Sequence, residues 1–150
     1  MLNKAYKVSI VYFLLFSLLL LASGLLIFAD KIGFSYIDIL HYYLGDINNF
    51  TSAKSFIGIS KIVVPHIFAF GLFVMVLLHF LIFTKRRDTK EFQIIIYLCA
   101  ISAFLEIFTA FLIIQGYTLF IYIKLFSFFI FYLCILYIIF ILFKSIIYDK

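Results

Sequence analysis

The chain has 150 residues, of which 67% are hydrophobic and only 13% are charged, and its mean hydropathy is +1.26. A soluble domain is nearer half apolar and a quarter charged, so these side chains cannot cover a water-facing globule. The composition therefore excludes an ordinary soluble domain and predicts an integral membrane protein whose apolar surface meets hydrocarbon.

The first predicted span covers about residues 8–28 and follows Lys4 and Lys7. A helix of about 20 residues crosses a bilayer core, and this stretch is long enough. A cleaved signal peptide is the competing interpretation, but its apolar region is only about 7–15 residues long. Cleavage would also leave three spans and place the C-terminal lysines outside. Ser17 and Gly24 lie on one face of this span.

Residues 29–61 form the only sizeable stretch between spans. Ser35 followed by Asp38 predicts a capping box, and Gly45 predicts the end of that helix. One face of the helix is apolar and the other is polar, which predicts that it lies flat on the outer surface or caps the bundle. The apolar face holds Tyr36, Leu40, Tyr43 and Leu44, and the polar face holds Asp38 and His41.

The segment after Gly45 has the chemistry of a turn. Its oxygen-bearing side chains also suggest calcium, but the glutamate that completes an EF-hand loop is missing, so a plain turn is the better interpretation. These side chains belong to Asp46, Asn48 and Asn49. Thr51 or Ser52 is predicted to cap the helix that leads into the second span.

Three further spans are predicted, at about residues 62–83, 92–114 and 117–143. The tight turn Gln115-Gly116 makes the last two an antiparallel hairpin. No repeat or linker interrupts the series, so we expect one integral membrane domain over residues 1–150. The predicted fold class is all-α, a four-helix transmembrane bundle with a short amphipathic helix in the outer loop.

The basic residues divide unequally between the two ends of the predicted bundle. Lys31, Lys54 and Lys61 fall at one end, beside three aspartates, whereas the other end holds Lys4, Lys7, Lys85, Arg86, Arg87, Lys90, Lys144 and Lys150. The positive-inside rule makes the second end cytoplasmic. We therefore expect a multi-pass protein of the bacterial inner membrane with both termini cytoplasmic. The partners expected are the lipid bilayer and other membrane subunits, and the placement of the charges argues against nucleic acid.

Four ionisable residues lie within the predicted spans: His66, His79, Glu106 and Lys124. Such residues are costly in a membrane and mark functional candidates. Counting along the helices places His66, Glu106 and Lys124 in the outer half, with His79 near the cytoplasmic end. Polar and small residues form a stripe on each of the last two spans, namely Cys99, Ser102, Glu106 and Thr109, and Lys124, Ser127, Phe131 and Cys134.

Facing stripes predict an intramembrane ion pair between Glu106 and Lys124 that fixes helix register. Alternatively, Lys124 reaches the outer interface and leaves Glu106 protonated or bonded to Thr109. A third interpretation joins His66 and Glu106, with or without Lys124, in a proton relay, ion site or metal site. The two cysteines, both inside apolar runs, are interpreted as buried thiols.

His66 and His79 are candidate ligands of haem b, since membrane bundles hold haem with histidines from facing helices. Thirteen residues separate them by about 20 Å and rotate the helix by about 220°, so they do not share a face. The other spans contain no histidine. A haem would therefore need His41 or a ligand from another subunit, while Met75 lies on the same helix as both histidines.

The residues Lys54-Ser55-Phe56, Pro65-His66-Ile67-Phe68-Ala69 and Leu78-His79-Phe80 resemble a group of small bacterial four-helix inner-membrane proteins. This resemblance covers about a third of the chain and implies a four-helix membrane protein without assigned activity. A looser similarity to small cytochrome-b-like bundles rests on the two histidines.

The sequence holds no phosphate loop, nucleophile elbow or HExxH motif. The function expected is an accessory or structural membrane subunit without catalysis of its own. The alternatives are a haem- or metal-binding redox protein that uses the second-span histidines, and a small proton or ion conductor centred on Glu106.

Overall fold

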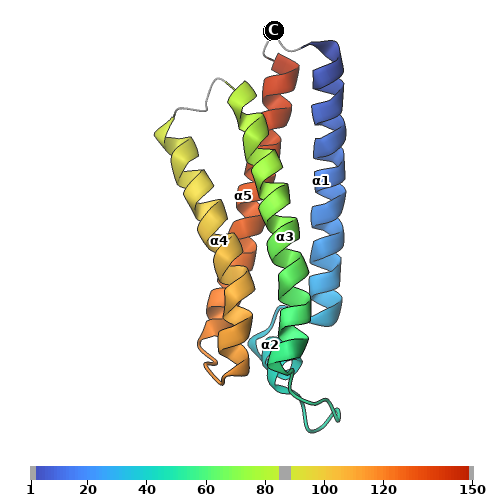
Figure 1. The fold of residues 1–150 in the computed structure, drawn as a ribbon, viewed down its shortest axis with the longest axis vertical. Coiled ribbons are helices and arrows are strands. Elements are labelled where there is room, and N and C mark those ends of the chain that lie inside the picture. The colour runs from blue at the N-terminus through green and yellow to red at the C-terminus, as the bar shows by residue number, and fades with distance from the viewer. Residues whose placement is uncertain (1–2, 85–88, 149–150) are drawn as a thin grey trace.

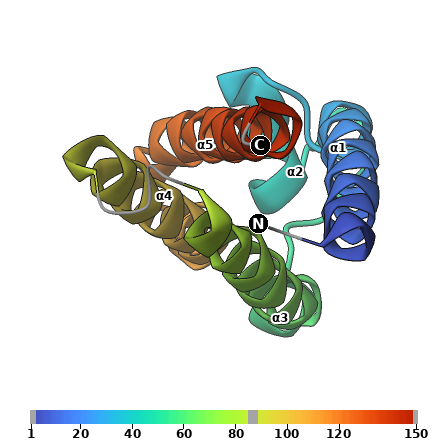
Figure 2. The same ribbon diagram turned by 90° about the horizontal axis from the view of Figure 1, so that it is seen from above.

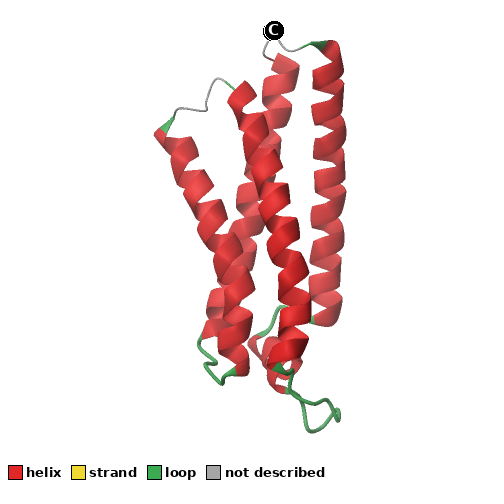
Figure 3. Cartoon of the chain, in the orientation of Figure 1, coloured by secondary structure: helices red, strands yellow, loops and turns green. Residues whose placement is uncertain are grey.

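A computed structural model describes residues 3–84 and 89–148, and this part of the chain is almost entirely helical (Figure 3). It contains no strand, as the all-α prediction required. In chain order the elements are α1 (Lys4–Lys31), α2 (Tyr36–Leu44), α3 (Phe56–Phe80), the 3-10 turn η1 (Leu81–Phe83), α4 (Lys90–Ile114) and α5 (Phe120–Tyr148).

Within the described residues, four helices are long and apolar enough to cross a membrane: Lys4–Lys31, Phe56–Phe83, Lys90–Ile114 and Phe120–Ile146. Large apolar side chains remain exposed along all of them, for example Leu26, Phe68, Tyr97 and Leu133. Such a surface is stable only against hydrocarbon or another apolar helix. The chain is therefore a multi-pass membrane protein in contact with the lipid bilayer, and the predicted fold class is confirmed.

The four long helices run alternately up and down (Figure 1). The start of α1 and the end of α5 lie at one end of the bundle. The short helix α2 and the turn between α4 and α5 lie at the other, which we call the α2 end. Seen from above, α1, α3, α4 and α5 surround the bundle axis, and α2 lies across one end of it (Figure 2).

The helix α5 is the central element. In the most apolar stretch of α5, half of the residues are buried within the protein. In the corresponding stretch of α3, only 11% are buried. The core has two parts. One lies among the four long helices and includes Leu14, Leu77, Phe92, Ile135 and Ile138, and the other lies near the α2 end and includes Ile39, Tyr43, Ile59, Ile113 and Ile121.

The short helix α2 forms as its sequence predicts. The Asp38 amide donates to Ser35 Oγ at 3.0 Å, and the Ser35 amide donates to Asp38 Oδ2 at 3.2 Å, which completes the capping box. Gly45 ends the helix. Ile39 and Tyr43 are buried, and α2 packs against α4 and α5. The helix therefore caps the bundle, with Ile39 added to the apolar face that the sequence indicated.

The predicted start of the next helix is wrong. Ser55, and not Thr51 or Ser52, caps α3, because its hydroxyl accepts from the Gly58 amide at 3.1 Å. Thr51 is engaged elsewhere, since it exchanges two main-chain hydrogen bonds with Asp46. The fourth long helix also begins at Phe120, three residues later than predicted, because the preceding turn continues past Gly116.

Candidate functional site

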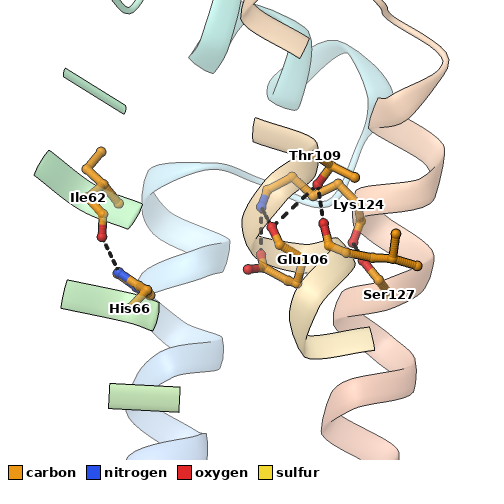
Figure 4. Close-up of polar contacts among 7 residues, drawn as sticks. Ile62, His66, Glu106, Thr109, Lys124 and Ser127 are labelled. Atoms are coloured by element: carbon orange, nitrogen blue, oxygen red, sulfur yellow. Dashed lines mark hydrogen bonds and ion pairs between the residues drawn. The ribbon is translucent and has the colours of Figure 1, made fainter. Parts of the chain in front are cut away.

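The structure brings Glu106 on α4 and Lys124 on α5 together (Figure 4). Lys124 Nζ donates to Glu106 Oε1 at 2.7 Å and to the Glu106 main-chain oxygen at 2.8 Å. The side chain of Lys124 is 4% exposed and that of Glu106 is 13% exposed. Both lie within candidate membrane spans, so the pair keeps two charges out of hydrocarbon.

The sequence positions this pair through two stripes of small and polar residues, both of which the structure buries. On α4, Cys99, Ser102 and Thr109 are buried, and on α5, Ser127 and Cys134 are buried. Small side chains let helices approach closely. The hydroxyls of Ser102, Thr109 and Ser127 each donate to a main-chain oxygen of their own helix, so they add no unpaired donor to the interface. Cys99 and Cys134 are free thiols, as expected.

A tyrosine from α2 covers the ion pair. Tyr43 is 4% exposed, and Lys124 Nζ lies 5.8 Å from the centre of its ring. An ammonium group has three donors. Two of them bond to Glu106, and the ring of Tyr43 provides a favourable aromatic surface for the remaining positive charge. Burial raises the pKa of the Tyr43 phenol well above 10.0, so the hydroxyl stays neutral.

His66 lies on α3 and is exposed. Its Nδ1 lies 2.7 Å from the Ile62 main-chain oxygen. A carbonyl oxygen only accepts, so Nδ1 is the donor in this contact, and Nε2 is the ring nitrogen that remains for another partner. Figure 4 joins His66 by a dashed line to Ile62 and not to Glu106. The structure therefore separates His66 from the bonded pair.

The position of His66 interrupts a packed seam on α3. Residues at alternating spacings of four and three share one face of a helix. The seam consists of Ile59, Val63, His66, Phe70, Phe73 and Leu77. Ile59, Val63 and Leu77 are buried, but His66 is exposed within the same stripe. It contacts Phe70 edge-on with 5.6 Å between the ring centres.

His79, near the other end of α3, is also exposed, and its ring lies edge-on to Phe83 at 6.5 Å. In residues 3–84 and 89–148, no three histidine, cysteine or acidic side chains form a group that could hold a metal ion. Lys85, Arg86, Arg87 and Lys150, which the positive-inside argument used, lie outside the described residues.

Some polar contacts, such as those of Tyr132 and His41, were not foreseen from the sequence. The Tyr132 hydroxyl on α5 donates to the Leu21 main-chain oxygen on α1 at 2.9 Å. It passes close to Gly24, where a Cβ atom would lie 2.6 Å from the hydroxyl. The pairing of Gly24 with Ser17 was a signal for this contact, but the partner tyrosine could not be chosen among the many in the sequence.

Another unforeseen contact lies in the loop after α2. His41 Nδ1 lies 3.3 Å from Asp46 Oδ2. The Asp46 carboxylate also accepts from the Asn48 amide at 2.9 Å and from the Asn49 side chain at 2.7 Å. The bond from the Asn48 amide is the main reason that the Asp46 pKa is lowered from 3.8. These oxygens therefore hold a turn, as the sequence favoured.

Comparison with known proteins identifies a family to which the chain belongs. The model Aq_1264_TM, described as a transmembrane helical domain, matches residues 33–150. The match includes α2 to α5, and with them Tyr43, His66, Glu106 and Lys124. No curated protein matches the chain, and no solved structure does. The chain therefore belongs to the Aq_1264_TM family of transmembrane helical domains.

Proposed function

We propose that this protein is an accessory subunit of the bacterial inner membrane, without catalysis of its own and with both termini in the cytoplasm. The observation that carries the proposal is the Lys124–Glu106 pair, in which each charged group is engaged by the other. A neutralised pair between two helices fixes their register and rotation. Breaking it would leave a buried charge, so wrong pairings of α4 and α5 are disfavoured.

The surface of α3 supports a partner in the membrane. His66 and His79 are exposed on different faces of this helix, although both lie within a candidate span. A polar ring that faces hydrocarbon is costly, and contact with another helix removes that cost. Gly71 lies between them, and a Cβ atom added there would meet nothing within 4 Å. Small residues on an open helix surface permit close approach of a second helix.

The test is extraction of the tagged protein from its native membrane in a mild detergent, followed by native gel electrophoresis. We expect a discrete complex with a second polypeptide at fixed stoichiometry. Gly71→Leu should dissociate the complex by filling the open surface of α3. Ala22→Leu, a matched enlargement at an exposed position on α1, should leave it unchanged. A lone chain, or a complex that resists Gly71→Leu, contradicts the proposed partner surface.

The same proposal predicts no flux through the protein. Purified protein in liposomes should conduct neither protons nor small ions above the level of empty vesicles. A flux that Glu106→Gln abolishes would assign the pair to conduction and would replace the structural role.

A second candidate, a haem- or metal-binding redox subunit, has one observation in its favour. The bond from His66 Nδ1 to Ile62 orients the ring and leaves Nε2 as the free ligand atom. A second ligand would come from another subunit. An absorption spectrum and a metal analysis of the native complex test this candidate. A Soret band or a stoichiometric metal that His66→Ala removes would support it, with His79→Ala as the comparison.

A further inference from the structure

The short helix α2 is placed as a cover over the buried charges. Its buried side chains, Ile39 and Tyr43, face the α2 end of α4 and α5 and belong to the same core cluster as Ala110 and Ile121. Tyr43 lies against the Lys124 ammonium group. The opposite side of α2 carries Ile37, which is 59% exposed. From this end of the bundle, α2 therefore covers the ammonium group through Tyr43.

Glycines in the left-handed region flank α2 on both sides. Gly33 has a φ of +83° and Gly45 a φ of +84°. Element-terminal residues of this kind absorb changes in backbone angle when a segment moves. Between them, α2 is a compact unit, because the capping box holds its first turn and Gly45 ends its last. It can therefore move as a rigid body about its two ends.

Side-chain packing holds α2 on the bundle. Ile39 and Tyr43 are buried, and Tyr36 stacks on Tyr122 of α5 with 5.2 Å between ring centres. Further half-buried side chains pack against the same core cluster, namely Leu40, Tyr42 and Leu44. With nine residues, α2 has only two fully buried side chains, fewer than each of the long helices. A short segment with fewer buried side chains opens at a lower free energy than the helices of the core. Loss of Tyr43 would remove both its buried area and the aromatic surface over Lys124.

We propose that α2 is a hinged lid that controls access of water and small ions, from the α2 end, to the Glu106–Lys124 pair. In the closed state described here, Tyr43 completes the surroundings of the ammonium group. Displacement of α2 exposes the pair to the aqueous phase without separating α4 from α5. This role is independent of the accessory role proposed above, because it concerns access to the pair and not the partner on α3.

The test measures how fast a membrane-impermeant thiol reagent modifies Thr109→Cys in proteoliposomes. Thr109 is 1% exposed and lies beside Lys124 (Figure 4). Ile47→Cys, at a position that is 93% exposed in the loop after α2, reports the side from which the reagent reaches the α2 end. The parent chain and Tyr43→Ala without the new cysteine give the background from the buried Cys99 and Cys134.

We expect slow modification of Thr109→Cys in the closed protein, from the same side that labels Ile47→Cys. Tyr43→Ala should raise the rate constant by about tenfold or more, since reactivity follows the population of the open state. Ile37→Ala, on the exposed side of α2, should leave the rate within about twofold of the parent. Tyr43→Phe, which keeps the ring, should also behave as the parent does.

Three results would overturn the lid. In the first, Thr109→Cys would react as fast as Ile47→Cys in the parent background, which would mean that α2 excludes nothing. In the second, Thr109→Cys would react no faster in the Tyr43→Ala background, which would mean that α2 does not control access. In the third, the reagent would modify Thr109→Cys from the opposite side of the membrane, which would mean that access does not pass α2. Circular dichroism and gel filtration must show that Tyr43→Ala keeps its helical content and elution volume. If that variant unfolds, Ile39→Ala replaces it with the same expected direction.

Discussion

Lys124 Nζ lies 2.7 Å from the carboxylate of Glu106 and 2.8 Å from the main-chain oxygen of the same residue. One position on α4 therefore supplies both acceptors of an ammonium group carried by α5. The main-chain oxygen is held in place by the helix, so it fixes where the ammonium group lies. The carboxylate then neutralises the charge at that point.

Removal of one partner of this pair should destabilise the protein more than removal of both. Lys124→Met leaves the Glu106 carboxylate buried without a counter-charge and should cost about 3 kcal/mol. Glu106→Gln should also lower stability, and the double variant should cost less than Lys124→Met alone. Thermal unfolding in detergent, followed by circular dichroism, measures all three. Additive losses would show that the two side chains do not act as a pair.

Gly24 and Tyr132 should show a similar dependence on each other. Gly24→Ala places a Cβ atom 2.6 Å from the Tyr132 hydroxyl and should lower the unfolding midpoint. Tyr132→Phe loses the bond to Leu21, at a cost of about 1 kcal/mol. In the double variant the nearest ring atom lies 3.9 Å from the new Cβ, an ordinary contact. Gly24→Ala should therefore be milder in the Tyr132→Phe background, and an equal loss in both backgrounds would contradict this docking of α1 on α5.

Gly45→Ala should weaken the region around α2. Its φ of +84° disfavours any side chain, and a Cβ atom would lie 2.6 Å from the Thr51 main-chain oxygen. We expect a loss of about 1–2 kcal/mol and faster amide hydrogen exchange across residues 36–51. Gly71→Ala is the matched control, because its surroundings are open and Ala favours a helix by about 0.5–1 kcal/mol. Equal behaviour of the two variants would contradict the geometry of this turn.

The loop after α2 should lose stability in acid. The pKa of Asp46 is lowered from 3.8 because the folded loop, through the Asn48 amide first, stabilises the carboxylate. A lowered folded pKa contributes stability that is present above 3.8 and is lost as the pH falls through the folded value. Amide exchange of residues 46–51 should therefore accelerate, relative to the intrinsic rate, below about pH 4. Asp46→Asn should remove that pH dependence, and a loop whose protection is constant down to pH 2 would contradict it.

Much of the architecture follows from local physical chemistry. An apolar stretch of about 20 residues spans a bilayer whatever its neighbours are, so all four long helices could be predicted from the sequence. The capping box of Ser35 and Asp38 and the turn at Gly116 also form from adjacent residues. The buried stripes of α4 and α5 could be found because helical periodicity alone places their residues on one face.

The start of α3 was misjudged for a non-local reason. Thr51 and Ser55 are both acceptable helix caps by residue type. Thr51 is used to close the loop on Asp46, five positions earlier, and only Ser55 remains to cap α3. Propensity could not rank the two, because the competing bond depends on how the whole loop folds.

The sequence by itself determined that this chain has four helices able to cross a membrane and which faces of the last two are polar, because both follow from hydropathy and helical period. Only the tertiary structure decided that α2 lies over Lys124, that Glu106 offers its main-chain oxygen as well as its carboxylate, and that His66 stays exposed within a packed seam. These relationships depend on the rotation and separation of helices far apart in the chain, which residue spacing does not encode.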